Sequence, residues 1–351
     1  MPTACVLQSK AAIHLKSRRL EITRIHPETG KQETLRSIPI HDLDRLIMDE
    51  NVHISSSAIA ELMRESIPVS LLGWNGRFLG GFLPVEPAHG RFRSNQYRQS
   101  LEREFVLGMA KCWVHHKIYN QRRTLQRLDA ARRQRRKETP ETMGTPEDGT
   151  ARLVADELGG YLKALHGDHT IDEIRGYEGA STSRYFRAWS TFLPEGIEFE
   201  RRSTRPPLNP VNACISFAST LLYQEAVAYL HAHGLDPCLG TLHTTEDGRW
   251  SLALDMIEPF RPVVGEALTL DLFSRSMLDV EKHFEPAKGG IYLNAAGRRK
   301  FMLQYERRME RQFMSEHAGH RTTLRQQVES QAVAYKSALL EPDSFRPFKM
   351  N

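Results

Sequence analysis

Residues 206–224 read PPLNPVNACISFASTLLYQ, a run without one charged side chain in a chain that is otherwise rich in charge. Prolines, asparagines and hydroxyl side chains interrupt the run, so it is a poor candidate for a membrane span. A helix that is apolar on most of its surface is instead typical of a protein interior. We therefore expect a buried central helix here, with the rest of the fold arranged around it.

The composition indicates a protein of ordinary globular type with local clusters of positive charge. The 351 residues include 48 Lys and Arg against 43 Asp and Glu, a net charge of +5. Clustered arginine attracts phosphate even when the total excess is mild. Cys5, Cys112, Cys214 and Cys238 follow no metal-ligand spacing, so we expect reduced, mostly buried thiols. Since the start has no targeting pattern and no membrane span is expected, we predict a cytoplasmic protein.

The hydrophobic pattern changes along the chain from strand-like to helical. Residues 1–85 contain short β-type runs broken by turns, together with one short helix capped by serines. Residues 86–97 have the Pro, Gly and polar content of a linker. Residues 98–319 alternate helical runs with short loops, and residues 320–351 read as a helical, partly loose tail. The predicted fold class is α+β, a small β-rich domain followed by a larger all-helical domain.

Two patterns in the helical region concern its surface and its core. A long helical segment ends in the basic run Arg132 to Lys137, followed by an acidic loop with Pro and Gly. Such a run is most often a solvated helix end, and a contact with DNA is the alternative. Apolar residues recur at every fourth position further on, at Phe301, Tyr305, Met309 and Phe313. This spacing predicts a core-facing stripe on one helix.

Four polar residues in stretches punctuated by Gly and Pro are the candidates for chemistry: Glu178, His243, Asp255 and Glu258. Carboxylates with one imidazole are a plausible ligand set for magnesium or manganese at a phosphodiester. Asp255 and Glu258 are three residues apart, which in a helix places them on one face. Their apolar neighbours raise the cost of leaving both charges unpaired, and a bound metal would remove that cost.

The surroundings of the other two candidates favour positioning and access. His243 ends the loop LDPCLGTLH, in which a proline and a glycine can hold the imidazole in place. Glu178 lies between Gly176 and Gly179, whose missing side chains allow another segment or a DNA backbone to come close. Nothing in the sequence by itself brings Glu178 to His243.

Each candidate also has a purely structural explanation. A histidine after a turn often serves only as a hydrogen-bonding group. Arg261 could neutralise the pair of acids at Asp255 and Glu258 without a metal, and Glu178 could simply pair with Arg175 or Arg184. Taken singly, these residues therefore leave the two interpretations open.

Four stretches together carry a more specific signal: IRGYEGASTSRYF (174–186), RPPLNPVNACISF (205–217), GLDPCLGTLH (234–243) and LALDMIEPFRP (252–262). In their order and spacing they resemble the CRISPR-associated integrases of spacer acquisition, the Cas1 family. The stretch KIYNQRRTLQRL (117–128) is similar to the Lys-x-x-Asn helix of that family. The resemblance extends from the β-rich start to about residue 315 and is sharpest from Ile174 to Pro262.

The resemblance implies a β-sandwich-like N-terminal domain that helps to form a homodimer, and a helical domain that carries the active site. It implies that Glu178, His243 and Glu258 bind Mg2+ or Mn2+ and that Asp255 supports catalysis or the metal. Arginines that could supply phosphate contacts near such a metal are Arg184, Arg187, Arg202, Arg205 and Arg261.

The implied activity is metal-dependent DNA strand transfer, in which the 3′-hydroxyl of a short duplex attacks a phosphodiester at the edge of a CRISPR repeat. The implied partners are double-stranded and branched DNA and a second, small CRISPR-associated acquisition protein that bridges two dimers. Two alternatives stay open. One is a structure-specific metal-dependent nuclease of DNA repair, and the other is a non-catalytic DNA-binding scaffold whose acids only pair with arginines.

Overall fold

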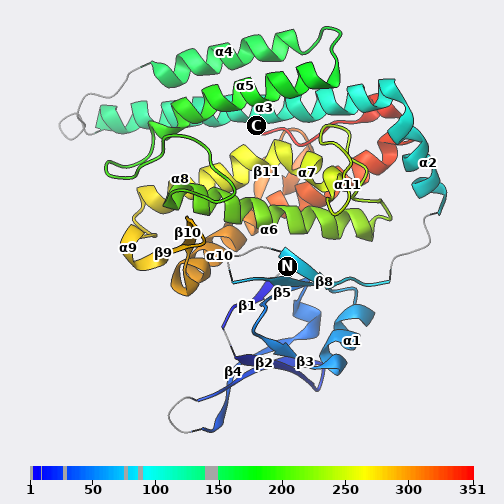
Figure 1. Cartoon of the computed structure of the whole chain (residues 1–351), viewed down its shortest axis with the longest axis vertical. Helices are drawn as coiled ribbons and strands as arrows, with labels where there is room; N and C mark the ends of the chain where they lie inside the picture. Colours follow the sequence, from blue (N-terminus) through cyan, green and yellow to red (C-terminus); the bar gives the residue numbers. More distant parts are fainter. Residues whose placement is uncertain (1–2, 9, 27–29, 75–77, 86–89, 139–148) are drawn as a thin grey trace.

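The computed structural model describes residues 3–8, 10–26, 30–74, 78–85, 90–138 and 149–351. Figure 1 shows these residues as two stacked parts, a small one made mainly of strands and a larger one made mainly of helices. The strands come first in the chain and the long helices follow, so the structure is of the mixed class that the sequence predicts. None of the described helices is both long and apolar enough to cross a membrane.

Two four-stranded sheets form the N-terminal part and share one hydrophobic core. The first sheet consists of β1 (Thr3–Val6), β5 (Arg45–Asp49), β7 (Val69–Leu72) and β8 (Phe78–Phe82), in that order. The second consists of β4 (Gln32–Pro39), β3 (Arg19–Ile25), β2 (Ala11–Lys16) and β6 (His53–Ile54). Both sheets contain parallel pairs, unlike the antiparallel sheets of a typical sandwich. The sandwich-like description is therefore not confirmed.

Helix α1 (Ser56–Arg64) is the serine-capped helix expected in this part, because the Ser55 side chain accepts the backbone N–H of Ala58. The larger part contains α2 (Gly90–Leu101), α3 (Arg103–Glu138), α4 (Thr150–Ala164), α5 (Ile171–Ser190), α6 (Pro210–Ala232) and α7 (Ser251–Ile257). It continues with the short turns η3 (Glu258–Phe260) and η4 (Pro262–Glu266), then α8 (Ala267–Ser274), α9 (Val280–His283), α10 (Ala295–Glu310) and α11 (Leu324–Ala338).

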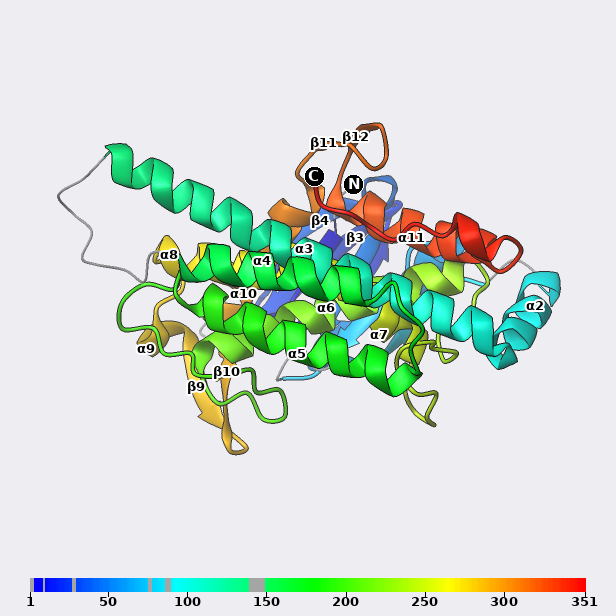
Figure 2. The same cartoon turned by 90° about the horizontal axis from the view of Figure 1, so that it is seen from above.

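Helix α6 is the central buried helix predicted from residues 206–224. It begins where the Asn209 side chain accepts the backbone N–H of Asn212, with Pro210 at its first position. Residues on different sides of this helix, such as Asn212, Ala218 and Leu221, are at most 1% exposed. Figure 1 shows α6 between the N-terminal strands and the layer formed by α3, α4 and α5, which lie side by side when seen from above in Figure 2.

The larger part was predicted to be all-helical. This prediction is wrong, because two short hairpins interrupt the helices. β9 (Phe284–Ala287) pairs with β10 (Gly290–Leu293), and β11 (Phe313–Ser315) pairs with β12 (His320–Thr322). Gly289 and Gly319 adopt positive φ angles in the two connections, a conformation that glycine allows without strain. Phe313 therefore leaves the predicted helical stripe and lies on β11, while Phe301, Tyr305 and Met309 are fully buried on α10.

Most of the segment predicted as a linker, residues 86–97, is helical from Gly90 onward, and residues 86–89 lie outside the described part. Buried amides attach this helix to distant segments. Asn95 donates to the Leu339 carbonyl at 2.5 Å, and Gln96 exchanges two hydrogen bonds of 2.8 Å with the backbone of Asp236. Local composition could not reveal these partners.

The C-terminal segment, predicted to be partly loose, is packed against the helices. Phe345 and Phe348 are 0% and 3% exposed, and the Phe348 ring stacks on Phe260 with centroids 4.5 Å apart. The amide of Asn120 on α3 also donates to the Phe348 carbonyl at 3.1 Å. Two aromatic side chains thus insert this segment into the core.

A buried network of charges joins the N-terminal part to the helical part. Glu225 of α6 lies 3.0 Å from the Arg45 guanidinium of β5 and 3.1 Å from that of Arg325 on α11. It also accepts a hydrogen bond of 3.2 Å from the Tyr305 hydroxyl. Burial alone would raise the pKa of the Glu225 carboxyl, but Arg325 and Arg45 outweigh burial and lower it. The first sheet is therefore held to α6 by an ionised group.

We expect Glu225→Ala to lower the free energy of unfolding by about 3–5 kcal/mol, because it leaves the Arg45 charge buried without its carboxylate. Urea denaturation followed by circular dichroism would measure the change. Glu329→Ala removes an exposed carboxylate on α11 and should change stability by less than about 0.5 kcal/mol. Equal small effects of the two substitutions would contradict a structural role for the network.

Candidate active site

Glu178 projects from α5 toward α3. The first turn of α5 is stabilised by a capping box, in which Thr170 and Glu173 exchange hydrogen bonds. Because α5 packs along α3, the Glu178 carboxylate contacts the Lys117 ammonium, and it also accepts a hydrogen bond of 3.1 Å from the Thr182 hydroxyl. Glu178 therefore pairs with a lysine from another helix. It does not pair with Arg175 or Arg184, the two partners considered from the sequence.

The α5 surface next to Glu178 is open. Gly176 and Gly179 are both exposed, and a Cβ atom added at either one would meet no described atom within 4 Å. Glycine inside a helix costs about 1 kcal/mol relative to alanine, and no contact within the described chain accounts for that cost. On the helix the two glycines point away from the Glu178 side chain, and they leave part of the outer surface of α5 open to a ligand from outside the chain.

Lys117 connects two acids inside the helical part. Its side chain is buried, contacts Glu178 and lies 2.6 Å from Oε2 of Glu258. Burial alone would lower the pKa of the Lys117 ammonium, but the charges of Glu178 and Glu258 outweigh it and raise the pKa. Lys117 was not among the predicted site residues. The only sequence feature that pointed to it was the resemblance of residues 117–128 to the Lys-x-x-Asn helix of the family.

Glu258 is a buried carboxylate between two cations. It begins η3, directly after α7, and its Oε1 lies 3.0 Å from Nε of Arg261. Burial favours the neutral acid, yet Arg261 and Lys117 together lower the pKa of Glu258 to about 2. Oε2 faces the Lys117 ammonium, so the position beside this buried oxygen already holds a positive charge.

Asp255 acts on the loop that carries His243. Its side chain is fully buried and accepts the backbone N–H groups of Thr241, Leu242 and His243 at 2.6, 2.9 and 2.9 Å. Its Oδ1 also lies 2.7 Å from Nδ1 of the His243 ring. A carboxylate that holds one ring nitrogen of a histidine orients the ring and leaves the other nitrogen free for a ligand. Asp255 therefore has the contacts of a positioning residue.

Arg175 brings the histidine loop to α5, a connection that the sequence did not show. Its Nε donates to the Leu242 carbonyl at 2.8 Å, and its Nη2 donates to the Thr244 hydroxyl at 3.0 Å. Leu242 and Thr244 flank His243 on both sides. Arg175 and Asp255 therefore both hold the loop that carries His243.

The donor set suits a hard or borderline divalent cation. Glu178 and Glu258 converge on one positive charge, and Nε2 of the His243 ring makes no hydrogen bond with the described residues. In the described part of the chain, however, no three His, Cys, Asp or Glu side chains already form a metal-binding cluster. The Lys117 ammonium occupies the position between the two acids.

The predicted phosphate-contacting arginines fall into two groups. Arg202 and Arg261 are already used inside the protein: Arg202 donates to Asn212 at 2.9 Å and to Ser216 at 3.0 Å, and Arg261 pairs with Glu258. Burial and the neighbouring Arg261 lower the pKa of Arg202 to about 10. Three others have exposed side chains, namely Arg184, Arg187 and Arg205. A contact with DNA stays a prediction for all five.

The basic run at the end of α3 is partly used for packing. The Arg132 guanidinium donates to the Thr191 carbonyl at 2.5 Å and lies 3.8 Å above the Phe192 ring. Arg133 pairs with Asp129 one turn earlier. At these two positions the run has the contacts of a structural helix end.

Comparison with known proteins places the chain in a family. Residues 4–307 match the family model described as CRISPR associated protein Cas1. The chain is 32% identical over 277 residues to the CRISPR-associated endonuclease Cas1 1 of Thermodesulfovibrio yellowstonii, covering 79% of this chain and 83% of the relative. It is 34% identical over 268 residues to a Cas4/Cas1 exonuclease–endonuclease fusion of Geobacter sulfurreducens, covering 75% of this chain. The chain spans about half the length of such fusion relatives, 46% in this case.

Solved structures share the fold. A casposase bound to integration product matches with a TM-score of 0.81 and 21% identity over 99% of this chain and 93% of the casposase. A Cas1 protein from Thermotoga maritima matches with a TM-score of 0.77 and 22% identity over the full length of both. The fold is that of the casposase and Cas1 class. The chain belongs to the Cas1 family, which confirms the resemblance seen in the sequence.

A further buried acid, Glu266, lies at the end of the π-helical turn η4 and is 3% exposed. Its Oε2 accepts no hydrogen bond from the described residues. Burial raises the pKa of Glu266 to about 7, although Lys117 and Tyr185 act in the opposite direction. A π-turn with an acid of raised pKa is a common feature near functional sites.

Glu266 should make stability depend on pH. Because its carboxyl binds a proton more tightly in the folded protein than in the unfolded chain, its stabilising contribution is complete below about pH 4.5 and is lost as the pH rises to about 7. We expect Glu266→Gln to be more stable than the wild type at pH 8, by no more than about 3 kcal/mol, and equal to it near pH 4.5. Urea titrations with EDTA at several pH values would measure this. The exposed Glu157→Gln should show no such trend, and a Glu266→Gln difference independent of pH would refute the assignment.

Proposed function

We propose that the protein is a metal-dependent DNA endonuclease and strand transferase that inserts new spacers into a CRISPR array. The observation that carries the proposal is the convergence of Glu178 and Glu258, from different elements, on one positive charge beside an oriented histidine and an open helix surface. Membership of the Cas1 family and the fold shared with a casposase bound to integration product support it.

Glu178, His243 and Glu258 would hold Mg2+ or Mn2+, since two carboxylates and one imidazole are acceptable to both ions. When bound, such an ion would polarise the phosphodiester and the attacking 3′-hydroxyl as a Lewis acid. Asp255 keeps the His243 ring oriented through Nδ1. Lys117 pairs with both acids and holds their side chains in position.

DNA would approach over the face of α5. Exposed Gly176 and Gly179 leave part of the outer surface of α5 uncovered, and exposed Arg184 and Arg187 lie one to three turns beyond Glu178 along the same helix. Such arginines would contact phosphates and orient double-stranded or branched DNA without reading its sequence. Arg202 and Arg261 are partly buried and already paired inside the protein, so they would contribute positive potential and no direct contact.

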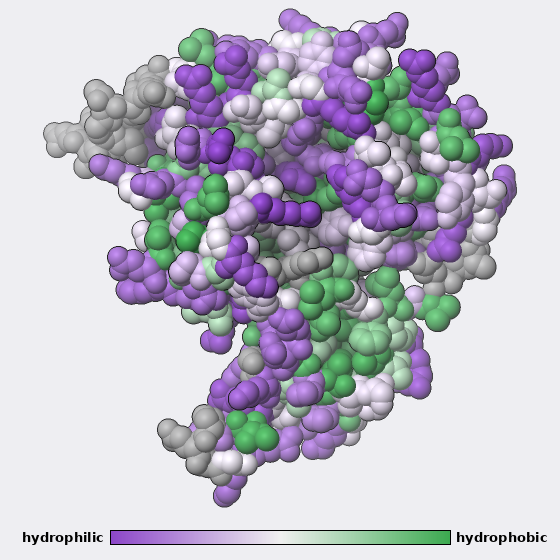
Figure 3. All heavy atoms as spheres, viewed as in Figure 1, coloured by the Kyte–Doolittle hydropathy of each residue, from purple (hydrophilic) through white to green (hydrophobic). Residues whose placement is uncertain are grey.

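The N-terminal part would form a homodimer. Exposed apolar side chains gather on and after the edge strand β8, at Leu79, Phe82, Leu83 and Val85. Figure 3 shows hydrophobic residues concentrated on one side of the N-terminal part, below the helical part. An apolar edge strand of this kind favours pairing with a second copy of the chain. A small Cas2-type partner is supported by a fold match to a Cas6-RT-Cas1–Cas2 complex, at a TM-score of 0.75 and 22% identity over 99% of this chain and 36% of the matched one.

Glu178→Ala and His243→Ala should each lower strand transfer by more than about 100-fold, because even the outer partners of metal ligands cost 10–100-fold when removed. The assay would combine the purified protein and its Cas2-type partner with Mn2+ or Mg2+, a branched duplex and a supercoiled plasmid bearing the repeat. Gel electrophoresis would separate joined from cleaved products, and DNA affinity would be measured in parallel. The exposed Glu157→Ala is the matched control.

The assay also separates the alternatives. A repair nuclease would give metal-dependent cleavage products and none longer than the substrate. A DNA-binding scaffold would retain DNA affinity in every variant and give no turnover in the wild type. Either pattern would rule out the integrase proposal.

Asp255→Asn tests the positioning of His243. The substituted amide cannot accept all the backbone N–H groups that Asp255 accepts, so we expect the apparent Mn2+ affinity to fall about 10–100-fold. A titration of activity against Mn2+ at a temperature where both proteins are folded would measure this. Asp247→Asn makes the same chemical change at an exposed position between His243 and Asp255. If the two variants have the same metal dependence, Asp255 has only a folding role.

A further inference from the structure

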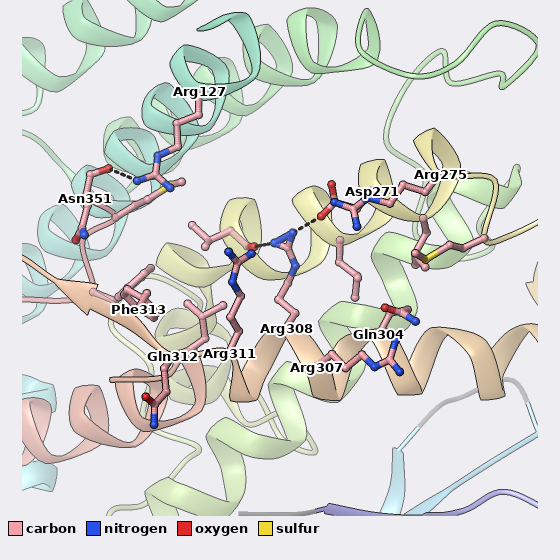
Figure 4. Close-up of a pocket in the computed structure, with 17 residues that line it drawn as sticks. Arg127, Asp271, Arg275, Gln304, Arg307, Arg308, Arg311, Gln312, Phe313 and Asn351 are labelled. Atoms are coloured by element: carbon pink, nitrogen blue, oxygen red, sulfur yellow. Dashed lines mark hydrogen bonds and ion pairs between the residues drawn. The ribbon is translucent and has the colours of Figure 1, made fainter. Parts of the chain in front are cut away.

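A cavity lies apart from the candidate active site, between α8, α10 and the C-terminal segment. Its volume is about 470 Å³, within the range of cavities that hold small organic ligands. Five arginines line it (Figure 4): Arg127 of α3, Arg275 directly after α8, Arg307 and Arg308 of α10, and Arg311 directly after α10. Residues far apart in the sequence thus direct positive charge into one space.

The positive charge of this cavity is only partly compensated. Five arginines line it and Asp271 is the one acid among its lining residues. Asp271 pairs with Arg308 at 2.7 Å, and Arg308 also donates to the Val263 carbonyl at 3.1 Å. Within the described part of the chain, Arg275, Arg307 and Arg311 make no side-chain hydrogen bond or ion pair, and all three are exposed.

Arg127 places a further positive charge at this cavity, near the other arginines. Its Nη2 donates to the Asn351 carbonyl at 3.2 Å. Partial burial and the neighbouring Arg123 lower the pKa of the Arg127 guanidinium. Convergent guanidinium groups repel one another, and an anion between them would remove that repulsion.

The inner wall of the cavity is apolar and partly aromatic. Leu268, Leu272, Phe313, Phe348 and Met350 contribute to it. Phe313 is half-buried on β11, whereas the Phe348 ring is buried and already stacked on Phe260. The amides of Gln304 and Gln312 stand at the same cavity and can both donate and accept hydrogen bonds. A ligand that fits must combine a flat, polar-edged apolar group with negative charge.

We propose that this cavity binds a nucleoside phosphate, with the base against Phe313 and the phosphate on Arg275, Arg307 and Arg311. Bases stack on aromatic rings regardless of sequence, and arginine binds phosphate through paired N–H groups. The nucleotide can come from a single DNA strand or from solution, and the chemistry of recognition is the same. The site goes beyond the proposed function and does not depend on it.

The cavity is separate from the candidate metal residues. Arg127 follows Lys117 on α3 by ten residues, about 15 Å along the helix axis. None of Glu178, His243, Asp255 and Glu258 lines the cavity. Binding here should therefore persist without metal ions and in a variant that lacks the Glu178 carboxylate.

Isothermal titration with EDTA would test the site on the full chain, using dAMP, ATP, a ten-residue thymidine oligonucleotide and inorganic phosphate as separate probes. We expect a nucleotide probe to bind, and Arg307→Ala combined with Arg311→Ala to weaken it at least about tenfold. The matched control is Arg299→Ala combined with Arg321→Ala, which removes two exposed arginines that do not line the cavity. That control should change affinity by less than about twofold.

The outcomes separate the possibilities. Binding of dAMP or ATP supports a site for soluble nucleotides, and binding of the oligonucleotide alone supports a site for a DNA strand. Phe313→Leu should weaken both kinds of probe and leave inorganic phosphate unchanged. Equal losses in the two arginine pairs would show a general electrostatic effect and overturn the proposal, as would binding of no probe. Unchanged binding in Glu178→Ala would separate this result from a failure of the integrase proposal.

Discussion

Polar side chains buried on one face of α3 must find partners inside the protein, and the arrangement of the helical part depends on this constraint. Lys117 pairs with Glu178 of α5 and with Glu258 of η3. One turn later, the Asn120 amide donates to the Pro259 carbonyl at 2.7 Å and its oxygen accepts the backbone N–H of Met350 at 2.8 Å. Gln121 donates to the Thr182 hydroxyl at 3.1 Å. Since an unpaired buried polar group costs several kcal/mol, these bonds define where α5, η3 and the C-terminal segment can lie.

The same constraint accounts for the positions of the side chains in the candidate active site. Glu258 and Glu178 each have a cationic neighbour, and Asp255 uses its two oxygens on the backbone and ring of the histidine loop. The carboxylates are thus held by groups that do not compete for the free nitrogen of His243. Preorganisation of this kind lowers the cost of positioning a reacting phosphate.

The arginine side chains of this chain make several different kinds of contact, and only the tertiary structure shows which arginine makes which. Arg45 and Arg325 join the N-terminal sheet to the central helix, Arg175 ties the histidine loop to α5, and Arg132 packs on an aromatic ring. Arg275, Arg307 and Arg311 line a cavity and pair with none of the described residues. A basic cluster in the sequence therefore indicates an anionic ligand only where the structure leaves its guanidinium groups unused.

The sequence by itself determined the order of a β-rich part and a helical part, the central buried helix and the family, because hydrophobic period and motif spacing are local properties. It also identified Glu178, His243, Asp255 and Glu258 as candidates. Only the tertiary structure decided their partners: Lys117 lies 61 residues from Glu178, and no local pattern reports such a contact. The packed C-terminal segment and the helix within residues 86–97 were missed for the same reason. Their stability comes from buried aromatic rings and long-range amide bonds, which form only when distant parts of the chain meet. The two hairpins are local, but their strands of three or four residues are too short to show a strand period.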